Sequence, residues 1–398
     1  MMKRTCVSVV ALGMALGSSS AFAEGPPYPN DGNGPFNGID KAGDVYGIPG
    51  LANNALDALV DQSSSDLGSF AGKDAVVQQD GSSNEATVNQ EGASSKVGIY
   101  QSTGVDDKGG LDGASNNDAA VTTAGSQNVV GIVQMSNGDT ATANVDGDNN
   151  IALQAQVGPE HPDENTAEID IDGNDNTVIQ GQGRSDGKAA RNKAIVDLDE
   201  GDGNAEQSTI EQFQDGFDNK AYVGNTASDS GYNANAYNNA EVLQEQVGDN
   251  NKAVLYGTLR DTTVEMIQLG SSNTARINEA NTAGGSSVTI SQDGKGNRAA
   301  LDKVGQNEST VTVSVDQIGD ENTVEAATIE NGADVTVTQD GTGHSFGKEN
   351  DKVNVDGATV NVHQTGQNQT AYLESTGPNN TVDIAQAGSG NVADITQE

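Results

Sequence analysis

A short pattern recurs along most of this chain and constrains the fold more than any other feature. The segment VEMIQLGSSNTARI at residues 264–277 returns as VTISQDGKGNRAAL at 288–301 and as VDIAQAGSGNVADI at 382–395. The shared core is Gln-x-Gly-x-x-Asn-x-Ala. Repetition at a nearly fixed spacing is typical of architectures in which each unit packs only on its neighbours.

The copies differ in how strictly they keep the pattern. Strict copies begin at Gln79, Gln214, Gln246, Gln268, Gln292 and Gln386. Two further copies carry one change each, Val324 for Ala after Gln317 and Gln369 for Asn after Gln364. Interrupted copies begin at Gln101, Gln156, Gln182 and Gln339, and resume at Asn117, Asn165, Asn192 and, more weakly, Asn350. With Gln134 as the poorest copy, the pattern predicts about thirteen units.

Within one unit, inward and outward residues alternate. Val264, Met266 and Gln268 share one side, a Gly-Ser turn follows, and Asn273, Ala275 and Ile277 continue with the same period. A period of two predicts strands, and frequent Gly, Asn and Asp turns argue against helices of ordinary length. One unit is therefore strand, turn, strand, turn. Stacked units predict an all-β fold, a β-solenoid of about thirteen strand-turn-strand rungs over residues 73–398.

Stacking also explains the fixed Gln and Asn. In a column of equivalent residues, each side-chain amide can donate to one neighbouring rung and accept from the other, so that no buried amide lacks a partner. Columns of this kind would also recognise the next molecule in a stack. The predicted self-assembly ladder comprises Gln79, Asn84, Gln214, Asn219, Gln246, Asn251, Gln268, Asn273, Gln292, Asn297, Gln317, Asn322, Gln386 and Asn391.

Composition is consistent with such a fold and excludes several functions. Only 33% of residues are hydrophobic and the formal charge is −39, which is typical of a chain too polar to build a thick core. A narrow stacked core avoids that difficulty. The negative charge argues against nucleic acid and anionic membrane surfaces as partners.

The N-terminus has the pattern of a secretory signal. Lys3 and Arg4 precede an apolar run at residues 7–16, and Ala21-Phe22-Ala23 fits a cleavage site. We therefore predict a signal peptide at 1–23 and a flexible Gly/Pro/Asn-rich leader at 24–72. The mature chain would contain no cysteine and no span long enough to cross a bilayer.

The repeat, with a second Gln four residues on at Gln90 and Gln397, resembles the curlin repeat of curli fibre subunits. The resemblance covers roughly residues 73–398. It implies a secreted bacterial amyloid subunit of the biofilm matrix, located in extracellular fimbria-like fibres that mediate adhesion. The partners that it implies are other copies of the chain, a nucleator subunit and an outer-membrane secretion pore that recognises the leader. This chain has more repeats and more acidic residues than familiar curlins.

Two further sequence features bear on assembly. The last repeat runs to the final residue, which predicts an uncovered strand edge that could template another chain. Acidic residues concentrate in turns, for example at Asp146, Asp148 and Asp199. Such charges would act as gatekeepers that slow premature assembly.

Motifs for catalysis or cofactor binding are not apparent, and we predict neither an enzyme nor a cofactor or metal site. The three histidines, His161, His344 and His363, are expected in solvated surface positions. Residues 146–150, DGDNN, faintly resemble a calcium loop but lack its Gly and bidentate Glu, which favours a simple turn.

Other readings of the sequence remain open. A monomeric acidic β-solenoid that binds calcium, a surface glycan or ice is the main alternative. Regular Thr-x-Thr rows would favour ice binding, but only fragments occur, such as Thr336-Val337-Thr338. A polysaccharide-active β-helix enzyme is a third reading.

Overall fold

The fold was analysed in a computed structural model. It describes residues 74–79, 81–101, 103–105, 111–112, 114–157, 164–183, 191–198, 208–224, 241–255, 263–277, 287–304, 312–329, 334–347, 359–375 and 381–397. The predicted signal peptide (1–23) and leader (24–72) lie outside these residues. Every helix or strand assigned within them is a β-strand.

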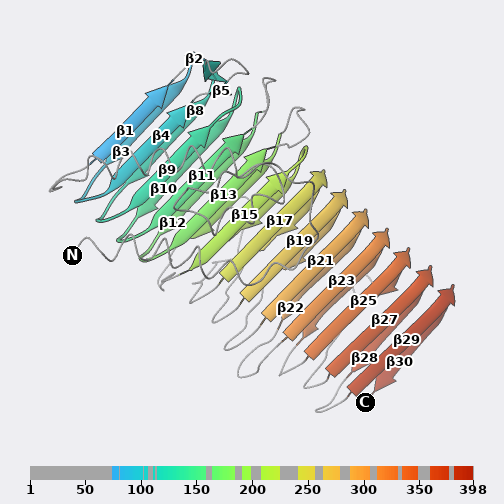
Figure 1. The fold of residues 1–398 in the computed structure, drawn as a ribbon. Coiled ribbons are helices and arrows are strands. Elements are labelled where there is room, and N and C mark those ends of the chain that lie inside the picture. Colours follow the sequence, from blue (N-terminus) through green and yellow to red (C-terminus); the bar gives the residue numbers. More distant parts are fainter. Residues whose placement is uncertain are drawn as a thin grey trace, which may run out of the picture.

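Two parallel sheets of thirteen strands each run the length of the molecule (Figure 1). The first sheet contains β1 (Asp74–Gln79), β4 (Lys96–Gln101), β9 (Val129–Gln134), β11 (Ile151–Val157), β13 (Thr177–Gly183), β15 (Thr209–Asp215), β17 (Glu241–Asp249), β19 (Thr263–Ser271), β21 (Ser287–Lys295), β23 (Thr312–Asp320), β25 (Asp334–Thr342), β27 (Thr359–Gln367) and β29 (Thr381–Ser389).

The second sheet contains β3 (Glu85–Gln90), β8 (Asp118–Thr123), β10 (Thr140–Asp146), β12 (Thr166–Asp172), β14 (Lys193–Leu198), β16 (Lys220–Val223), β18 (Lys252–Val254), β20 (Thr274–Ile277), β22 (Arg298–Val304), β24 (Thr323–Ile329), β26 (Ser345–Phe346), β28 (Thr370–Ser375) and β30 (Val392–Gln397). Two small pairs lie beside them, β2 (Gly81–Ser82) with β7 (Ala114–Ser115) and β5 (Thr103–Val105) with β6 (Leu111–Asp112). The chain alternates between the two long sheets, so the prediction of an all-β solenoid is confirmed.

Neighbouring strands pair so that equivalent repeat positions stack. β19 and β21 join Val264 to Val288 and Gln268 to Gln292, and the same register continues into β23. A shift by one residue would turn the apolar side outward, so the hydrophobic pattern holds the register.

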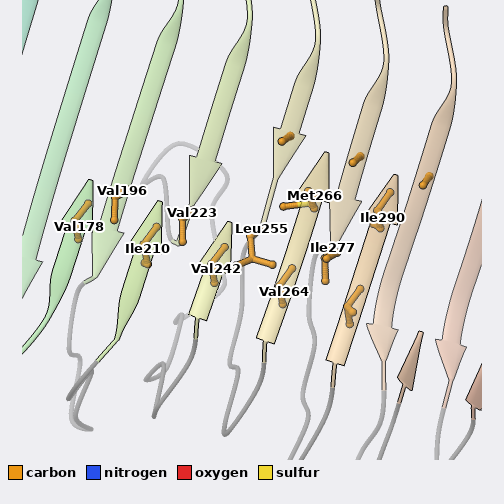
Figure 2. Close-up of a cluster of buried hydrophobic side chains, with 14 of the residues drawn as sticks. Val178, Val196, Ile210, Val223, Val242, Leu255, Val264, Met266, Ile277 and Ile290 are labelled. Carbon is orange, nitrogen blue, oxygen red and sulfur yellow. The ribbon is translucent and has the colours of Figure 1, made fainter. Parts of the chain in front are cut away.

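The core is a thin layer between the two sheets (Figure 2). Val264 and Met266 of β19 are at most 1% exposed, and Ala275 and Ile277 of the facing strand β20 are fully buried. Burial alternates along β19 as the predicted period of two requires. Alanine fills many inward positions of the second sheet, and Val324 and Phe346 take the same position in β24 and β26 and are also buried.

The turn after the Gln strand depends on glycine. Gly294 has φ +126°, and a Cβ on it would lie 2.1 Å from the carbonyl oxygen of Gly319 in the next rung. The same contact recurs from Gly319 to Gly341 and from Gly366 to Gly388. Only a residue without a side chain permits this approach of one turn to the next.

Connection lengths change sides along the solenoid. We call the connection from a first-sheet strand to the following second-sheet strand the Gln–Asn corner, and the opposite connection the return corner. The return corner is short from β8 to β9 and from β10 to β11, whereas residues 224–240 separate β16 from β17 there. The Gln–Asn corner is short from β15 onward, whereas residues 184–192 separate β13 from β14 there.

Candidate functional site: amide columns and open ends

A continuous ladder of glutamines runs through the buried interior. Each Gln side chain donates from Nε2 to Oε1 of the Gln in the next rung, at 2.7–3.1 Å. The ladder contains Gln79, Gln101, Gln134, Gln156, Gln182, Gln214, Gln246, Gln268, Gln292, Gln317, Gln339, Gln364 and Gln386. Every bond points from the N-terminal rung toward the C-terminal rung.

The same amides also tie the two sheets together. Nε2 of Gln268 donates to the backbone oxygen of Lys252 at 3.1 Å, and Nε2 of Gln292 donates to that of Thr274 at 3.1 Å. Both N–H groups of these fully buried amides are therefore satisfied. A buried amide that lost either partner would cost about 1–3 kcal/mol.

A second column lies one residue before the second-sheet strands. The backbone N–H of Asn273 donates to Oδ1 of Asn251 at 3.0 Å, and its Nδ2 donates to the backbone oxygens of Leu269 and Gly294 at 2.9 and 3.1 Å. Each Asn of the column therefore bonds to the turn of its own rung and to the turn of the next rung. It includes the predicted residues Asn84, Asn219, Asn251, Asn273, Asn297 and Asn322, while Asn391 occupies the same position in the last rung.

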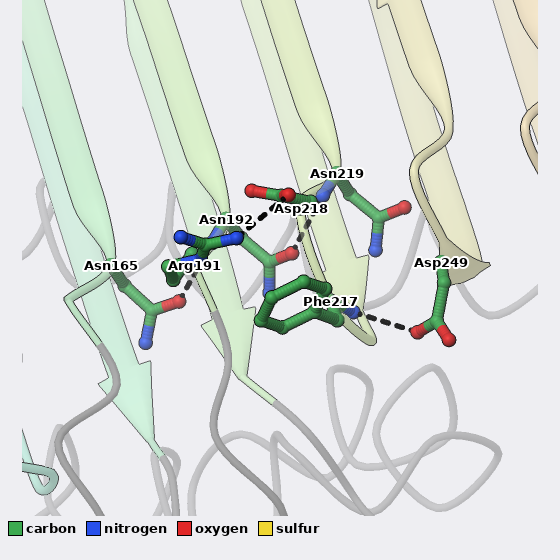
Figure 3. A network of polar contacts seen from close by, with 7 residues as sticks. All are labelled: Asn165, Arg191, Asn192, Phe217, Asp218, Asn219 and Asp249. Carbon is green, nitrogen blue, oxygen red and sulfur yellow. Dashed lines mark hydrogen bonds and ion pairs between the residues drawn. The ribbon is translucent and has the colours of Figure 1, made fainter.

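Three interrupted copies resume as the sequence predicts. Asn117, Asn165 and Asn192 all lie in the Asn column. Figure 3 shows the Asn165, Asn192 and Asn219 steps of this column. Beside them, Arg191 pairs with Asp218 at 3.0 Å and lies 4.6 Å from the centre of the Phe217 ring. Longer connections thus leave the column intact.

The Gln339 copy is not interrupted, so the prediction that it resumes at Asn350 is wrong. His344 takes the Asn position instead, with 1% of its surface exposed. Its backbone N–H donates to Oδ1 of Asn322 at 3.0 Å, and its Nδ1 accepts from the backbone N–H of Gln369 at 3.4 Å. The expected surface role of His344 is therefore also wrong. His363 is exposed as predicted, and His161 lies outside the described residues.

The poorest copy carries a buried carboxylate in the same column. Asp139 is fully buried, and its Oδ1 accepts from the backbone N–H of Asn165 at 3.0 Å and from Nδ2 of Asn165 at 3.1 Å. Ser136, at the place of the usual turn Gly, donates its hydroxyl to Oδ2 of Asp139. Burial raises the pKa of Asp139 to about 6 despite these hydrogen bonds.

Sequence reasoning missed two further columns. Gln154, Gln180, Gln212 and Gln244 form a second ladder at 2.8–3.0 Å. Their signal is a Gln-x-Gln pair in four successive copies, since residues two apart in a strand face the same side. Ser95, Asn128, Asn150, Asn176 and Ser208 form a column at the return corner.

The loop that faintly resembles a calcium site is a turn of this column. Oδ1 of Asp148 accepts from the backbone N–H and the hydroxyl of Ser126, both at 2.7 Å. These bonds hold the pKa of Asp148 below its usual range. Among the described residues, no three His, Cys, Asp or Glu side chains group closely enough to hold a metal ion.

The two ends of the stack present complementary groups. Val77 in the first rung is 45% exposed, whereas its register partner Ile99 is fully buried. Gln79 is exposed at the acceptor end of the ladder, and Gln386 stands at the donor end. A Cβ on Gly388 would meet nothing closer than 3.9 Å. Within the described residues, β1, β3, β29 and β30 are edge strands.

Comparisons with known proteins identify no relative from which a function could be inferred. No family model matches the chain, and no curated protein matches it. No helix in the described part of the chain is long and apolar enough to span a membrane.

Proposed function

We propose that this protein is a secreted structural subunit that self-assembles head to tail into extracellular, curli-like amyloid fibres for a biofilm matrix and adhesion. Each copy would contribute about thirteen rungs. The proposal combines the curlin-like repeat with the geometry of the amide ladders.

The direction of the Gln ladder is the observation that carries the proposal. Every internal Gln donates forward and accepts from behind, so the first rung offers Oε1 of Gln79 and the last rung offers Nε2 of Gln386. Those are the two halves of one more ladder bond. A second copy placed on the C-terminal end would continue both sheets at the strand spacing of roughly 4.8 Å.

Further support comes from the edges and the core. The outer strands of a parallel stack carry backbone groups that can pair with another chain. The partly exposed Val77 would be covered by the last rung of the preceding copy, as Ile99 is covered inside the molecule. Burial of apolar surface and completion of the ladder therefore favour the same contact.

Export and nucleation are proposed from the resemblance alone. Residues 1–23 would direct secretion, and residues 24–72 would engage an outer-membrane pore. A nucleator subunit would supply the first template.

The turn glycines offer a sharp test. Inside the stack, a Cβ on Gly366 would lie 2.1 Å from the carbonyl oxygen of Gly388, but a Cβ on Gly388 has open space in the single molecule. In a fibre, the first turn of the next copy would fill that space. At φ +107° an alanine strains this last turn whatever the space around it, but it meets no neighbouring turn in the single molecule. Gly388→Ala should therefore confine its cost to the last rung and block growth of the rod. Gly390→Ala is the control for a side chain added to the same turn, because Gly390 also has positive φ, at +70°, and a Cβ on it would meet no described atom within 4 Å.

The full chain and both variants would be diluted from denaturant and followed by electron microscopy and fibre diffraction. The proposal expects fibres with a reflection near 4.7–4.8 Å from the unmodified chain and from Gly390→Ala, and short rods from Gly388→Ala. Unmodified chain that stays as single rods at both low and high salt would overturn it and favour a monomeric binding protein. Equal fibre growth by Gly388→Ala would overturn the head-to-tail contact.

A further inference from the structure

The first residue of each second-sheet strand forms an outward column with an ordered sequence of charges. Register places Glu85 beside Asp118, then Thr140, Thr166, Lys193, Lys220 and Lys252 in successive rungs. We call these seven residues the charge column. It is acidic at the N-terminal end, neutral over two rungs, and basic over the next three.

The basic part is unusual for this chain. Lysines and arginines number 19 against 58 acidic residues, yet three lysines stack on adjacent strands, where like charges repel. Within the described residues, no acidic side chain pairs with Lys193, Lys220 or Lys252. Arg298, farther along the same row, does have such a partner, Glu325 at 3.2 Å. Among the described residues, the three lysines thus have no acidic partner that would compete with a contact to another molecule.

The acidic part of the same column matches two of these lysines, Lys193 and Lys220, in spacing and position. Glu85 and Asp118 are exposed, as are Lys220 and Lys252, while Lys193 is half-buried. A second copy can pack against the outer face of this sheet through a two-fold axis that lies between β10 and β12 and is parallel to the strands. This axis keeps the first residues of the strands aligned and reverses the order of the rungs in the second copy. Asp118 then lies opposite Lys193 of the second copy, and Glu85 lies opposite Lys220 of the second copy. Thr140 lies opposite Thr166 of the second copy.

We infer that the second sheet is a lateral interface between two antiparallel copies of this chain, aligned by the charge column. The contact is isologous, so each pair occurs twice. It differs from the head-to-tail contact of the proposed fibre and does not depend on it. Asp146 and Asp172 would face each other at the far ends of the same strands, which keeps the association weak and reversible.

Net charge predicts how this pairing responds to salt. Two rods of charge −39 repel over the Debye length, about 30 Å at 0.01 M salt, which shortens to about 8 Å at 0.15 M. Contact pairs survive that moderate screening and weaken near 1 M, where the length is about 3 Å. Pairing is therefore strongest at intermediate salt. General screening without specific pairs would give a monotonic rise.

The test is sedimentation velocity on the full chain carrying Gly388→Ala, a change that leaves the second sheet untouched. The parent should dimerise with a maximum at intermediate salt. Two double variants reverse one side of the pairs, Lys193→Glu/Lys220→Glu and Glu85→Lys/Asp118→Lys. Each should weaken self-association by roughly tenfold or more, because all four contact pairs become repulsive. An equimolar mixture of these two variants should form heterodimers.

Lys252→Glu/Lys295→Glu is the matched control, since it makes the same change in net charge outside the predicted pairs. It should dimerise like its parent. A parent that is monomeric at every salt concentration, or charge variants that dimerise equally well, would overturn the lateral interface. A monomeric parent that binds inorganic polyphosphate through Lys193 and Lys220 would also overturn it and assign the lysines to an anionic polymer. The fibre proposal is judged separately, by whether the unmodified chain forms fibres.

Discussion

Nε2 of Gln292 donates to Oε1 of Gln317 at 2.7 Å, although 25 residues separate them in the chain. Both side chains are fully buried. The bond makes the polar interior of one rung complete only when the next rung is in place. Stability in such a stack is therefore shared between neighbours and is lowest at the ends.

Breaking the ladder in its middle should destabilise several rungs. Gln292→Leu would leave Nε2 of Gln268 and Oε1 of Gln317 without their ladder partners in the core. We expect a local loss of about 2–6 kcal/mol, since each of the two unpaired buried groups costs roughly 1–3 kcal/mol. Hydrogen exchange of β19, β21 and β23 measures it. Ser291→Ala, one residue away on the outer side, should change protection little; equal effects of the two substitutions would contradict the ladder's role.

The turn glycines should tolerate no side chain inside the stack. Gly319→Ala would bring a Cβ to 2.0 Å from the carbonyl oxygen of Gly341, at φ +102°. We expect a loss of about 3 kcal/mol or more, because both the clash and the backbone strain must be relieved. Thermal unfolding followed by circular dichroism would detect it. A variant as stable as the unmodified protein would mean that adjacent turns are not in contact.

Asp139 should make its part of the solenoid less stable as pH rises. Burial raises the folded-state pKa from 3.8 to about 6, so the folded protein binds this proton more tightly than the unfolded chain. The resulting stabilisation is fully present below pH 3.8 and is lost as pH rises through about 6. A shift of this size corresponds to about 3 kcal/mol.

Asp139→Asn would test that dependence and restore the usual residue of the column. In the unmodified protein, the protection of β8, β10 and β12 from hydrogen exchange should fall between pH 3.8 and about 6, after correction for intrinsic exchange. The variant should lose less. Glu211 lies on β15, and burial and the charge of Glu241 raise its pKa to about 7. The pH dependence of exchange in β15 therefore serves as a distant reference, which Asp139→Asn should leave unchanged. An unchanged pH dependence in β10 would exclude Asp139 as its source.

Assembly should accelerate when charge repulsion is reduced. Asp316 lies on the outer face of the first sheet, and burial and the charges of Asp340 and Asp293 raise its pKa. Salt, divalent cations or mild acid would each weaken such repulsion between and within copies. Light scattering at several NaCl concentrations should give shorter lag times as salt rises. A lag time indifferent to ionic strength would argue against acidic residues as brakes on assembly.

Much of the fold could be predicted because the same alternation of buried and exposed residues recurs in each repeat. The alternation around Gln268 and Asn273 specifies which side is buried, and stacking then specifies the neighbours. The repeat pattern does not predict His344 because it requires Asn at this position, whereas the column requires only an acceptor for the next backbone N–H. An imidazole nitrogen meets that need, as does the carboxylate of Asp139.

Other features depend on geometry that one unit does not reveal. The second ladder, from Gln154 to Gln244, arises because inward positions two residues apart both reach the interior. The charge column becomes visible only when the register aligns Lys193, Lys220 and Lys252, whose spacing in sequence is irregular.

The exchange of long and short connections between the two corners has a consequence for how such a chain can diversify. From β17 to β29 the Gln–Asn corner stays short, whereas the length of the return corner varies and the register of the strands is unchanged. Short peptides inserted between β20 and β21 and between β22 and β23 would project from one side in single file, roughly 4.8 Å apart. The rod could therefore display inserted peptides in a regular row, in which the backbone sets the spacing between the peptides and each insert sets its own sequence.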